Sequence, residues 1–259
     1  MSVAVSYQLL TRDIDRTLET TANRASVKLE SEYYLANIAG VTSLDDFLAD
    51  TRLFRYAMNA FGLGDLDFAK GYMRKILEEG VSDPLSLANR TNDPKIRAFA
   101  ETFDFDTYGD LTATRAATRE AVVDRYVRQT LEETAGQQDG EGVRLALYFE
   151  RQAPEIGSVY DILADQALFA VVRTVLGLPD SFSAVDIERQ ATVLGERLDL
   201  EEFKDPEALR QFLTRFTTVW DATEATQTDP ILSLFNTSTQ PTISLDLVLA
   251  FQAFRQGGA

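Results

Sequence analysis

Apolar side chains recur along residues 44–61 with the spacing of one helix face. They occupy positions 44, 47, 48, 54, 57, 58 and 61, and residues three or four apart lie on the same side of an α-helix. Ser43 precedes this stripe as a residue that can cap a helix, and Gly62 follows it as a residue that tolerates a left-handed turn. The pattern predicts one helix of about five turns between Ser43 and Gly62.

The same phrase returns later in the chain. Residues 48–65, LADTRLFRYAMNAFGLGD, and residues 163–180, LADQALFAVVRTVLGLPD, are identical at eight of 18 positions without a gap, whereas chance would give about one. Ser158 and Gly177 provide the same start and stop for the second copy. Looser matches continue on both sides, pairing 15–22 with 128–135 and 92–103 with 204–216.

These matches predict a duplicated unit of about 110 residues. We expect a first helical repeat at 1–112, a second at 113–226 and a C-terminal helical extension at 227–259. With only two copies, we expect a pseudo-twofold pair that shares one core within one compact domain, and not a solenoid.

Other segments also show the helical period. Residues 66–79 predict an amphipathic helix that ends at Gly80 and turns Phe68, Tyr72, Met73, Ile76 and Leu77 toward a core. Residues 113–135 predict a long helix that ends at Gly136.

Two Asp-Pro pairs mark further helix starts. Asp93-Pro94 and Asp205-Pro206 are typical of an N-cap followed by proline in the first helical turn. ISLDLVL at 243–249 alternates as a strand would, but Ser244 as a cap and the AFQAF that follows favour a helix. The predicted fold is therefore all-α and multihelical.

The composition of the chain limits the kinds of catalytic and metal site that it can form. The chain has no cysteine and no histidine, which excludes disulfides, thiol nucleophiles, Cys/His zinc sites, histidine-ligated haem and Ser-His-Asp triads. Carboxylates, Lys, Tyr and Arg remain, but no motif arranges them for catalysis. We predict a protein that is not an enzyme, with no catalytic residues, no cofactor and no metal.

The net charge of the chain indicates which classes of partner it can bind. Lys and Arg number 25 against 41 Asp and Glu, a net charge of −16. Such a surface repels nucleic acid and anionic lipid headgroups. The N-terminal residues lack the pattern of a signal peptide, and the longest apolar run, 167–172, is too short to span a bilayer. We expect a cytoplasmic protein with protein partners.

Two short motifs imitate known sites. FDFDTYGDLT at 103–112 resembles a calcium loop, but Tyr108 and Arg115 stand where ligands are needed, and a capped turn explains the segment better. GLGDLD at 62–67 contains G-x-G without the preceding strand or third glycine of a dinucleotide site, so helix capping is the better interpretation.

Four residues are candidates for an interaction surface. Tyr33 and Tyr34 are adjacent aromatics, so one of them could stay exposed as an interface anchor, although one core residue beside one core-edge residue explains the pair better. Arg115 and Arg119 could dock an acidic partner, although ordinary surface ion pairs account for them better.

Three stretches of the sequence resemble a known family: residues 32–63, 69–90 and 124–165. The first stretch begins with EYYLANIAGV, and the third ends with SVYDILAD. Nearly the whole chain, from about residue 7 to 255, resembles the bacterial domain-of-unknown-function family numbered twelve-seventeen. Its members occur mainly in alphaproteobacteria, often encoded among flagellar basal-body genes. The resemblance implies an all-α fold and a flagellar connection, and it brings no catalytic or binding residues.

These observations leave three functional hypotheses. The first is a non-enzymatic adaptor, chaperone or assembly factor of the bacterial flagellum. The second is a structural component exported through the flagellar apparatus, since 7–18 and 245–255 could form terminal amphipathic helices. The third is a small-molecule binder or carboxylate-dependent enzyme that uses a cleft between the repeats.

Overall fold

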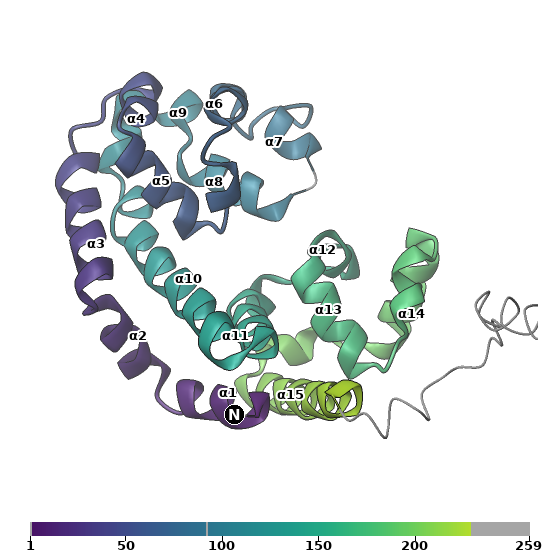
Figure 1. The fold of residues 1–259 in the computed structure, drawn as a ribbon. Coiled ribbons are helices and arrows are strands. Elements are labelled where there is room, and N and C mark those ends of the chain that lie inside the picture. The colour runs from purple at the N-terminus through teal and green to yellow at the C-terminus, as the bar shows by residue number, and fades with distance from the viewer. Residues whose placement is uncertain (1, 92, 229–259) are drawn as a thin grey trace, which may run out of the picture. The chain divides into compact units, whose positions relative to one another are not determined.

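The structure is a computed structural model that describes residues 2–91 and 93–228, and its regular elements there are all helices (Figure 1). This confirms the predicted all-α, multihelical fold. Residues 229–259, with the ISLDLVL segment, lie outside the described residues. The α-helices are α1 (Val3–Thr11), α2 (Ile14–Ala22), α3 (Ala25–Ile38), α4 (Leu44–Ala49), α5 (Thr51–Ala60), α6 (Lys70–Glu79), α7 (Leu87–Arg90), α8 (Pro94–Thr102), α9 (Phe105–Tyr108), α10 (Glu120–Asp139), α11 (Glu141–Gln152), α12 (Val159–Ala164), α13 (Gln166–Val175), α14 (Ile187–Arg197) and α15 (Pro206–Thr228).

Short 3₁₀ helices connect several of these elements. They are η1 (Gly64–Leu66), η2 (Gly109–Thr114), η3 (Ala116–Thr118), η4 (Ala153–Glu155), η5 (Asp180–Ala184) and η6 (Leu200–Lys204). Met1–Asp221 form one compact unit, and the end of α15 from residue 222 belongs to a second. Within the first unit, the carboxylate of Asp221 on α15 accepts hydrogen bonds from the amides of Val3 and Ala4, at 2.7 and 3.0 Å, which ties the start of α1 to α15.

The repeated phrase folds as two helices in each copy, so the single five-turn helix predicted between Ser43 and Gly62 is wrong. The carboxylate of Asp50 accepts hydrogen bonds from the amides of residues 52 and 53, both at 3.0 Å. Asp165 does the same for residues 167 and 168, at 2.8 and 3.1 Å. Because an aspartate N-cap holds an extended backbone, it ends α4 and α12 and starts α5 and α13.

The outer ends of the phrase are as predicted. The hydroxyls of Ser43 and Ser158 accept from the amides of residues 46 and 161. Gly62 and Gly177 follow the second helices with φ of 67° and 63°, a conformation that costs glycine little. The two copies thus share their local structure, while the pseudo-symmetry of the halves and their boundary near residue 112 remain predictions.

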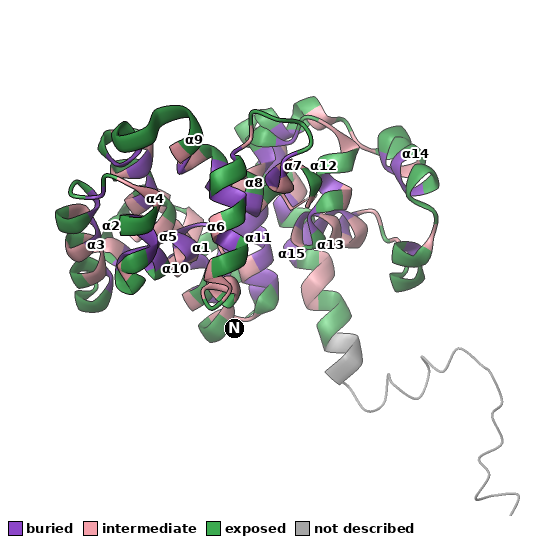
Figure 2. Ribbon diagram, turned by 90° about the horizontal axis from the view of Figure 1, so that it is seen from above, coloured by how far each residue is buried: buried purple, intermediate pink, exposed green. Residues whose placement is uncertain are grey.

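Buried apolar residues gather in two clusters, and not in the single shared core that we expected. The N-terminal cluster, within residues 34–122, centres on a group of phenylalanines in which the rings of Phe47 and Phe103 stack at 4.7 Å. The C-terminal cluster joins residues from α1 to residues 131–216 and includes Phe149 and Phe216. In Figure 2, buried segments (purple) lie around α4 and α5 and again around α11 and α13.

Helix α10 belongs to both clusters, because it contributes Val122 to the N-terminal one and Leu131 to the C-terminal one. Its bounds differ from the prediction of a helix over 113–135. The chain before Glu120 forms 3₁₀ turns, and the helix continues through Gly136 to end before Gly140, whose φ is 106°. Gly136 serves close packing, since a Cβ there would lie 3.1 Å from the side chain of Arg144.

Helix α6 also begins later than expected. Met73, Ile76 and Leu77 are fully buried and Gly80 ends the helix with φ of 60°, as predicted. Phe68 precedes α6 in a loop and is 81% exposed, and Tyr72 is exposed too, so their predicted inward orientation is wrong. The predicted caps Asp93 and Asp205 both accept hydrogen bonds from the first turns of α8 and α15.

Candidate functional site

A groove lies between the two clusters. Its first hollow has a volume of about 620 Å³ and lies between α7–α8 on one side and α11, α12 and α14 on the other. Its second hollow, of about 730 Å³, continues toward Trp220 on α15. The hollows share Asp93, Pro94, Ala164 and Asp165, so we treat them as the two ends of one groove, named the groove below.

The first end of the groove is mainly apolar. Ile156 and Leu168 are buried members of the C-terminal cluster, and they extend to its wall. Beside them Tyr160 is 47% exposed and Ile187 is 54% exposed. The Tyr160 hydroxyl donates to the Glu188 carboxylate at 3.0 Å. The wall therefore carries two large apolar side chains that no part of the described chain covers fully.

The second end of the groove is more polar. It contains Lys95, Gln166 and Arg144, which is paired with Glu141. Trp220 also contributes, and its indole nitrogen is buried without a hydrogen-bond acceptor among the described residues.

Close packing explains the orphaned indole nitrogen. A Cβ placed on Gly142 would lie 2.7 Å from the Trp220 ring, so the indole rests directly on the backbone of α11. Gly142 lies in the first turn of α11, which has no side-chain cap, and Trp220 also lines the second hollow of the groove. Gly142 is therefore required for this contact.

The two aspartates that both ends of the groove share are used as helix caps. Asp93 caps α8 and Asp165 caps α13. Asp165 also accepts a short hydrogen bond from the buried Tyr148 hydroxyl. Burial raises the pKa of Tyr148, and the charge of Asp165 raises it further. These groups hold the helix ends in place, and none forms the paired acid and base of a hydrolase.

A buried ion network joins α10 to α11. The Glu132 carboxylate, 1% exposed, lies 3.2 Å from Arg128 Nε and 2.7 Å from Arg151 Nε. Arg128 also donates to the carbonyl of Leu147 and lies 3.1 Å from Glu150. Burial alone would lower the pKa of Arg151, but its hydrogen bonds and charge interaction with Glu132 outweigh this and raise it. The network fixes the helix that connects the clusters.

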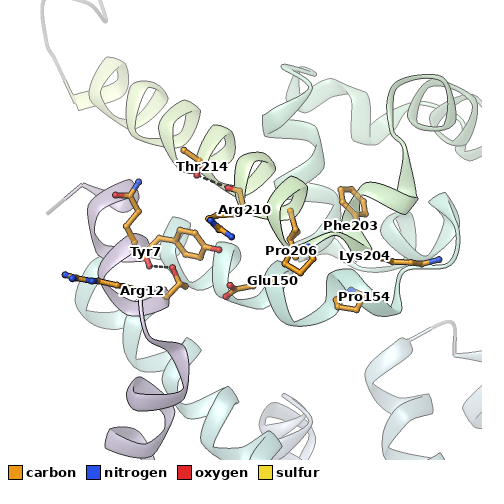
Figure 3. Close-up of a pocket in the computed structure, with 12 residues that line it drawn as sticks. Tyr7, Arg12, Glu150, Pro154, Phe203, Lys204, Pro206, Arg210 and Thr214 are labelled. Atoms are coloured by element: carbon orange, nitrogen blue, oxygen red, sulfur yellow. Dashed lines mark hydrogen bonds between the residues drawn. The ribbon is translucent and has the colours of Figure 1, made fainter.

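A separate hollow of about 740 Å³ lies between α1 and the start of α15 (Figure 3). Tyr7 and Arg210 point into it above Glu150, whereas Arg12 points away. Burial raises the pKa of Tyr7, and the charge of Glu150 adds to the shift. Lys204 lies 2.7 Å from Glu201, and Glu150 lies beside Arg128. Nearby partners compensate these charges, so this hollow is the weaker candidate.

The predicted interaction residues do not form one surface. Tyr34 is fully buried, stacks on Tyr56 at 4.5 Å and donates to the carbonyl of Thr118 at 2.5 Å. Its prediction as a surface residue is therefore wrong, because its ring fills the N-terminal cluster. Tyr33 is half-buried, donates to Asp50 at 2.8 Å and lies under the guanidinium of Arg52 at 3.9 Å.

The two predicted arginines have local partners. Arg115 lies 3.8 Å above the ring of Tyr108 and donates to the carbonyl of Thr102 at 3.3 Å. Arg119 lies 3.7 Å from Glu120. Neither residue lines the groove, so whether either binds a partner remains a prediction.

The groove residues were not found from the sequence. Tyr160 and Ile187 each follow a capped helix start by one or two residues, off the apolar stripe, where such residues usually face solvent. The available signal was large apolar residues at solvent-facing positions. Such positions alone do not reveal that α7 and α8 lie opposite Tyr160 and Ile187 and complete the groove.

The calcium-like segment is a capped turn, as predicted. The Asp104 carboxylate accepts from the amide of Thr107 at 2.9 Å, and Gly109 has φ of 52°. Across the described residues, acidic side chains form no group suited to a metal ion. In the same part of the chain, no helix has the length and apolar character needed to cross a bilayer.

Comparison with known proteins gives two matches. Residues 60–209 match the DUF1217 family, described as a protein of unknown function. A crystal structure of a protein from Agrobacterium tumefaciens, a structural-genomics target, is 40% identical and has a TM-score of 0.78. The match covers 86% of this chain and 96% of that one. No curated protein matches.

Proposed function

This chain belongs to the DUF1217 family, and from that premise we propose that it is a non-enzymatic adaptor, chaperone or assembly factor of the bacterial flagellum that binds a protein partner in the groove. The single observation that carries the proposal is the apolar wall around Tyr160 and Ile187. Exposed large apolar side chains in a concave, helix-lined surface are typical of protein recognition.

The chemistry of the groove supports binding over catalysis. Asp93 and Asp165 are engaged as helix caps, and the chain has no histidine or cysteine. The flagellar part of the proposal rests only on the resemblance to a family whose members are often encoded among flagellar basal-body genes. A cytoplasmic location is proposed with it.

The test is a pair of single substitutions in a flagellated host that carries the gene. Ile187→Lys places a charge on the apolar wall, and Leu29→Lys, at a 60% exposed position on α3, is the matched control. We expect tagged wild-type protein and the Leu29→Lys variant to retain a flagellar or export component and support motility. We expect Ile187→Lys to lose both while its circular dichroism is unchanged.

Two results would refute the proposal. Recovery of no flagellar component with the wild-type chain, together with full motility after deletion of the gene, excludes the flagellar role. Equal retention by the wild type and Ile187→Lys excludes the groove as the binding surface. Recovery of the chain itself in secreted or basal-body fractions would favour an exported structural component instead.

The polar end of the groove supports a second candidate, a small-molecule binder. Lys95, Arg144 and Gln166 surround a hollow of about 730 Å³, a volume within the range of ligand pockets. The fluorescence of Trp220, the one tryptophan of the chain, reports on this end directly. A saturable fluorescence change with a metabolite extract, abolished by Gln166→Ala, would favour this candidate.

A further inference from the structure

We infer that the segment received by the groove is an amphipathic helix with an apolar stripe and basic flanks. The inference rests on the proposed function and specifies the chemistry of the partner. The stripe would pack on Tyr160 and Ile187, and the basic side chains would face the acidic residues of the groove.

The walls of the groove favour a helical partner. They are formed by α8, α12 and α14, whose backbone groups are engaged within the helices and their caps. An extended segment would find no free sheet edge to pair with, and its buried amides and carbonyls would lose water without replacement. A helix satisfies its own backbone and presents only side chains, so it matches a groove with helical walls.

The apolar wall is held in place before any partner binds. The Asp186 carboxylate accepts from the amide of Glu188 at 3.0 Å and fixes the first turn of α14, where Ile187 lies. The Glu188 side chain in turn accepts from the Tyr160 hydroxyl. Two anchor residues on different helices are thereby linked through one glutamate, which lowers the entropy cost of binding.

The charge of the groove favours basic residues beside the apolar stripe of the partner helix. The apolar end of the groove is lined by four carboxylates and one guanidinium: Asp93, Glu155, Asp161 and Asp165 against Arg97. Arg97 lies 2.9 Å from Glu101, so its charge is already paired. Asp93, Asp161 and Asp165 accept hydrogen bonds from backbone amides at helix starts and keep their negative charge, and Glu155 is exposed. At the other end of the groove, Arg144 is paired with Glu141 and Lys95 adds one positive charge. A helix with lysine or arginine beside its apolar stripe complements this surface, and an acidic one is repelled.

The test uses three synthetic peptides of about 18 residues, long enough to form a helix when bound. One has a leucine stripe flanked by lysine, the second has glutamate in place of lysine, and the third is the lysine peptide with its order scrambled to destroy the stripe. Their binding to the full chain is measured by fluorescence anisotropy at low and high salt.

Four variants locate the binding. Ile187→Ala removes an anchor, and Leu29→Ala is its control. Glu155→Lys reverses an exposed charge that lines the groove, and Glu19→Lys makes the same change on the exposed face of α2. We expect micromolar binding of the lysine-flanked peptide, about tenfold weaker in Ile187→Ala and Glu155→Lys and within about twofold of wild type in both controls.

Each alternative outcome overturns the inference. Equal binding of the scrambled peptide, or equal losses in Glu155→Lys and Glu19→Lys, would show general charge attraction. Equal binding of the glutamate peptide would exclude the basic flanks. Failure of all three peptides to bind below about 1 mM would exclude an amphipathic helix as the ligand. The host experiment with Ile187→Lys does not depend on peptide chemistry, so it judges the proposed function separately.

Discussion

At the scale of single residues, Gly142 shows how one missing side chain shapes the groove. Gly142→Ala would place a methyl group 2.7 Å from the Trp220 ring, so the indole must move. We expect the free energy of unfolding to fall by about 1–3 kcal/mol. The emission of this sole tryptophan should shift to longer wavelength as the ring gains contact with water.

The matched control is Gly195→Ala on α14, where an added Cβ meets nothing within 4 Å. This change should raise stability by about 0.5–1 kcal/mol, because alanine favours the helix. Urea unfolding with fluorescence detection checks both variants. Unchanged stability and emission in Gly142→Ala would show that the indole does not depend on the glycine.

The Glu132 network makes a second prediction at this scale. Glu132→Gln leaves the guanidinium groups of Arg128 and Arg151 without their shared carboxylate in a buried place. We expect a loss of about 3–5 kcal/mol. Glu101→Gln breaks an exposed pair with Arg97 and should cost less than about 1 kcal/mol. If the two variants lose similar amounts of unfolding free energy, the buried Glu132 network stabilises the chain no more than an exposed ion pair does, which would contradict this prediction.

At the scale of elements, the break at Asp50 separates what periodicity can predict from what it cannot. The stripe at 44–61 located the helical segment and both outer caps. It missed the break, because a side-chain cap leaves the apolar period nearly intact. The sign of the break in the sequence is that the apolar stripe skips from position 48 to position 54. In the structure Leu53, which is not part of that stripe, is also fully buried.

We expect Asp50→Ala to destabilise the chain by about 1–2 kcal/mol, since α5 loses its cap. Asp50→Asn keeps an oxygen that can accept the same bonds, so it should lose less than half as much. Thermal unfolding followed by circular dichroism measures both. Equal losses would mean that the charge of Asp50, and not its capping oxygen, matters.

At the scale of the whole molecule, the sequence predicted the fold class but not the site. The helices follow from local patterns of apolar residues, caps and glycines. The groove brings residues 88–97 opposite residues 152–187, and that juxtaposition depends on how α10 passes through both clusters. In the sequence, the ion network that joins α10 to α11 appears only as separate charged residues on two helices.

Four buried tyrosines predict how the molecule responds to alkali. Burial is the first cause that raises the pKa of each: Tyr7, Tyr34, Tyr56 and Tyr148. The unfolded chain releases these protons near pH 10, whereas the folded chain keeps them to higher pH. Their stabilising contribution is therefore complete below about pH 10 and is lost as pH rises through the folded pKa.

Urea unfolding from about pH 8 to 11, together with phenolate absorbance, checks this. We expect stability to fall above about pH 10 and these phenols to ionise only as the fold is lost. Ionisation of all tyrosines near pH 10 with the circular dichroism spectrum unchanged would contradict their burial.

If the proposed function is right, position 187 in the groove contacts the partner protein and position 29 on α3 does not. Site-specific photocrosslinking in a flagellated host tests it most directly, with the crosslinking residue at position 187 in one strain and at position 29 in another. We predict a discrete crosslinked protein band from position 187 that is absent from position 29. No band from position 187, or the same band from both positions, would contradict the claim.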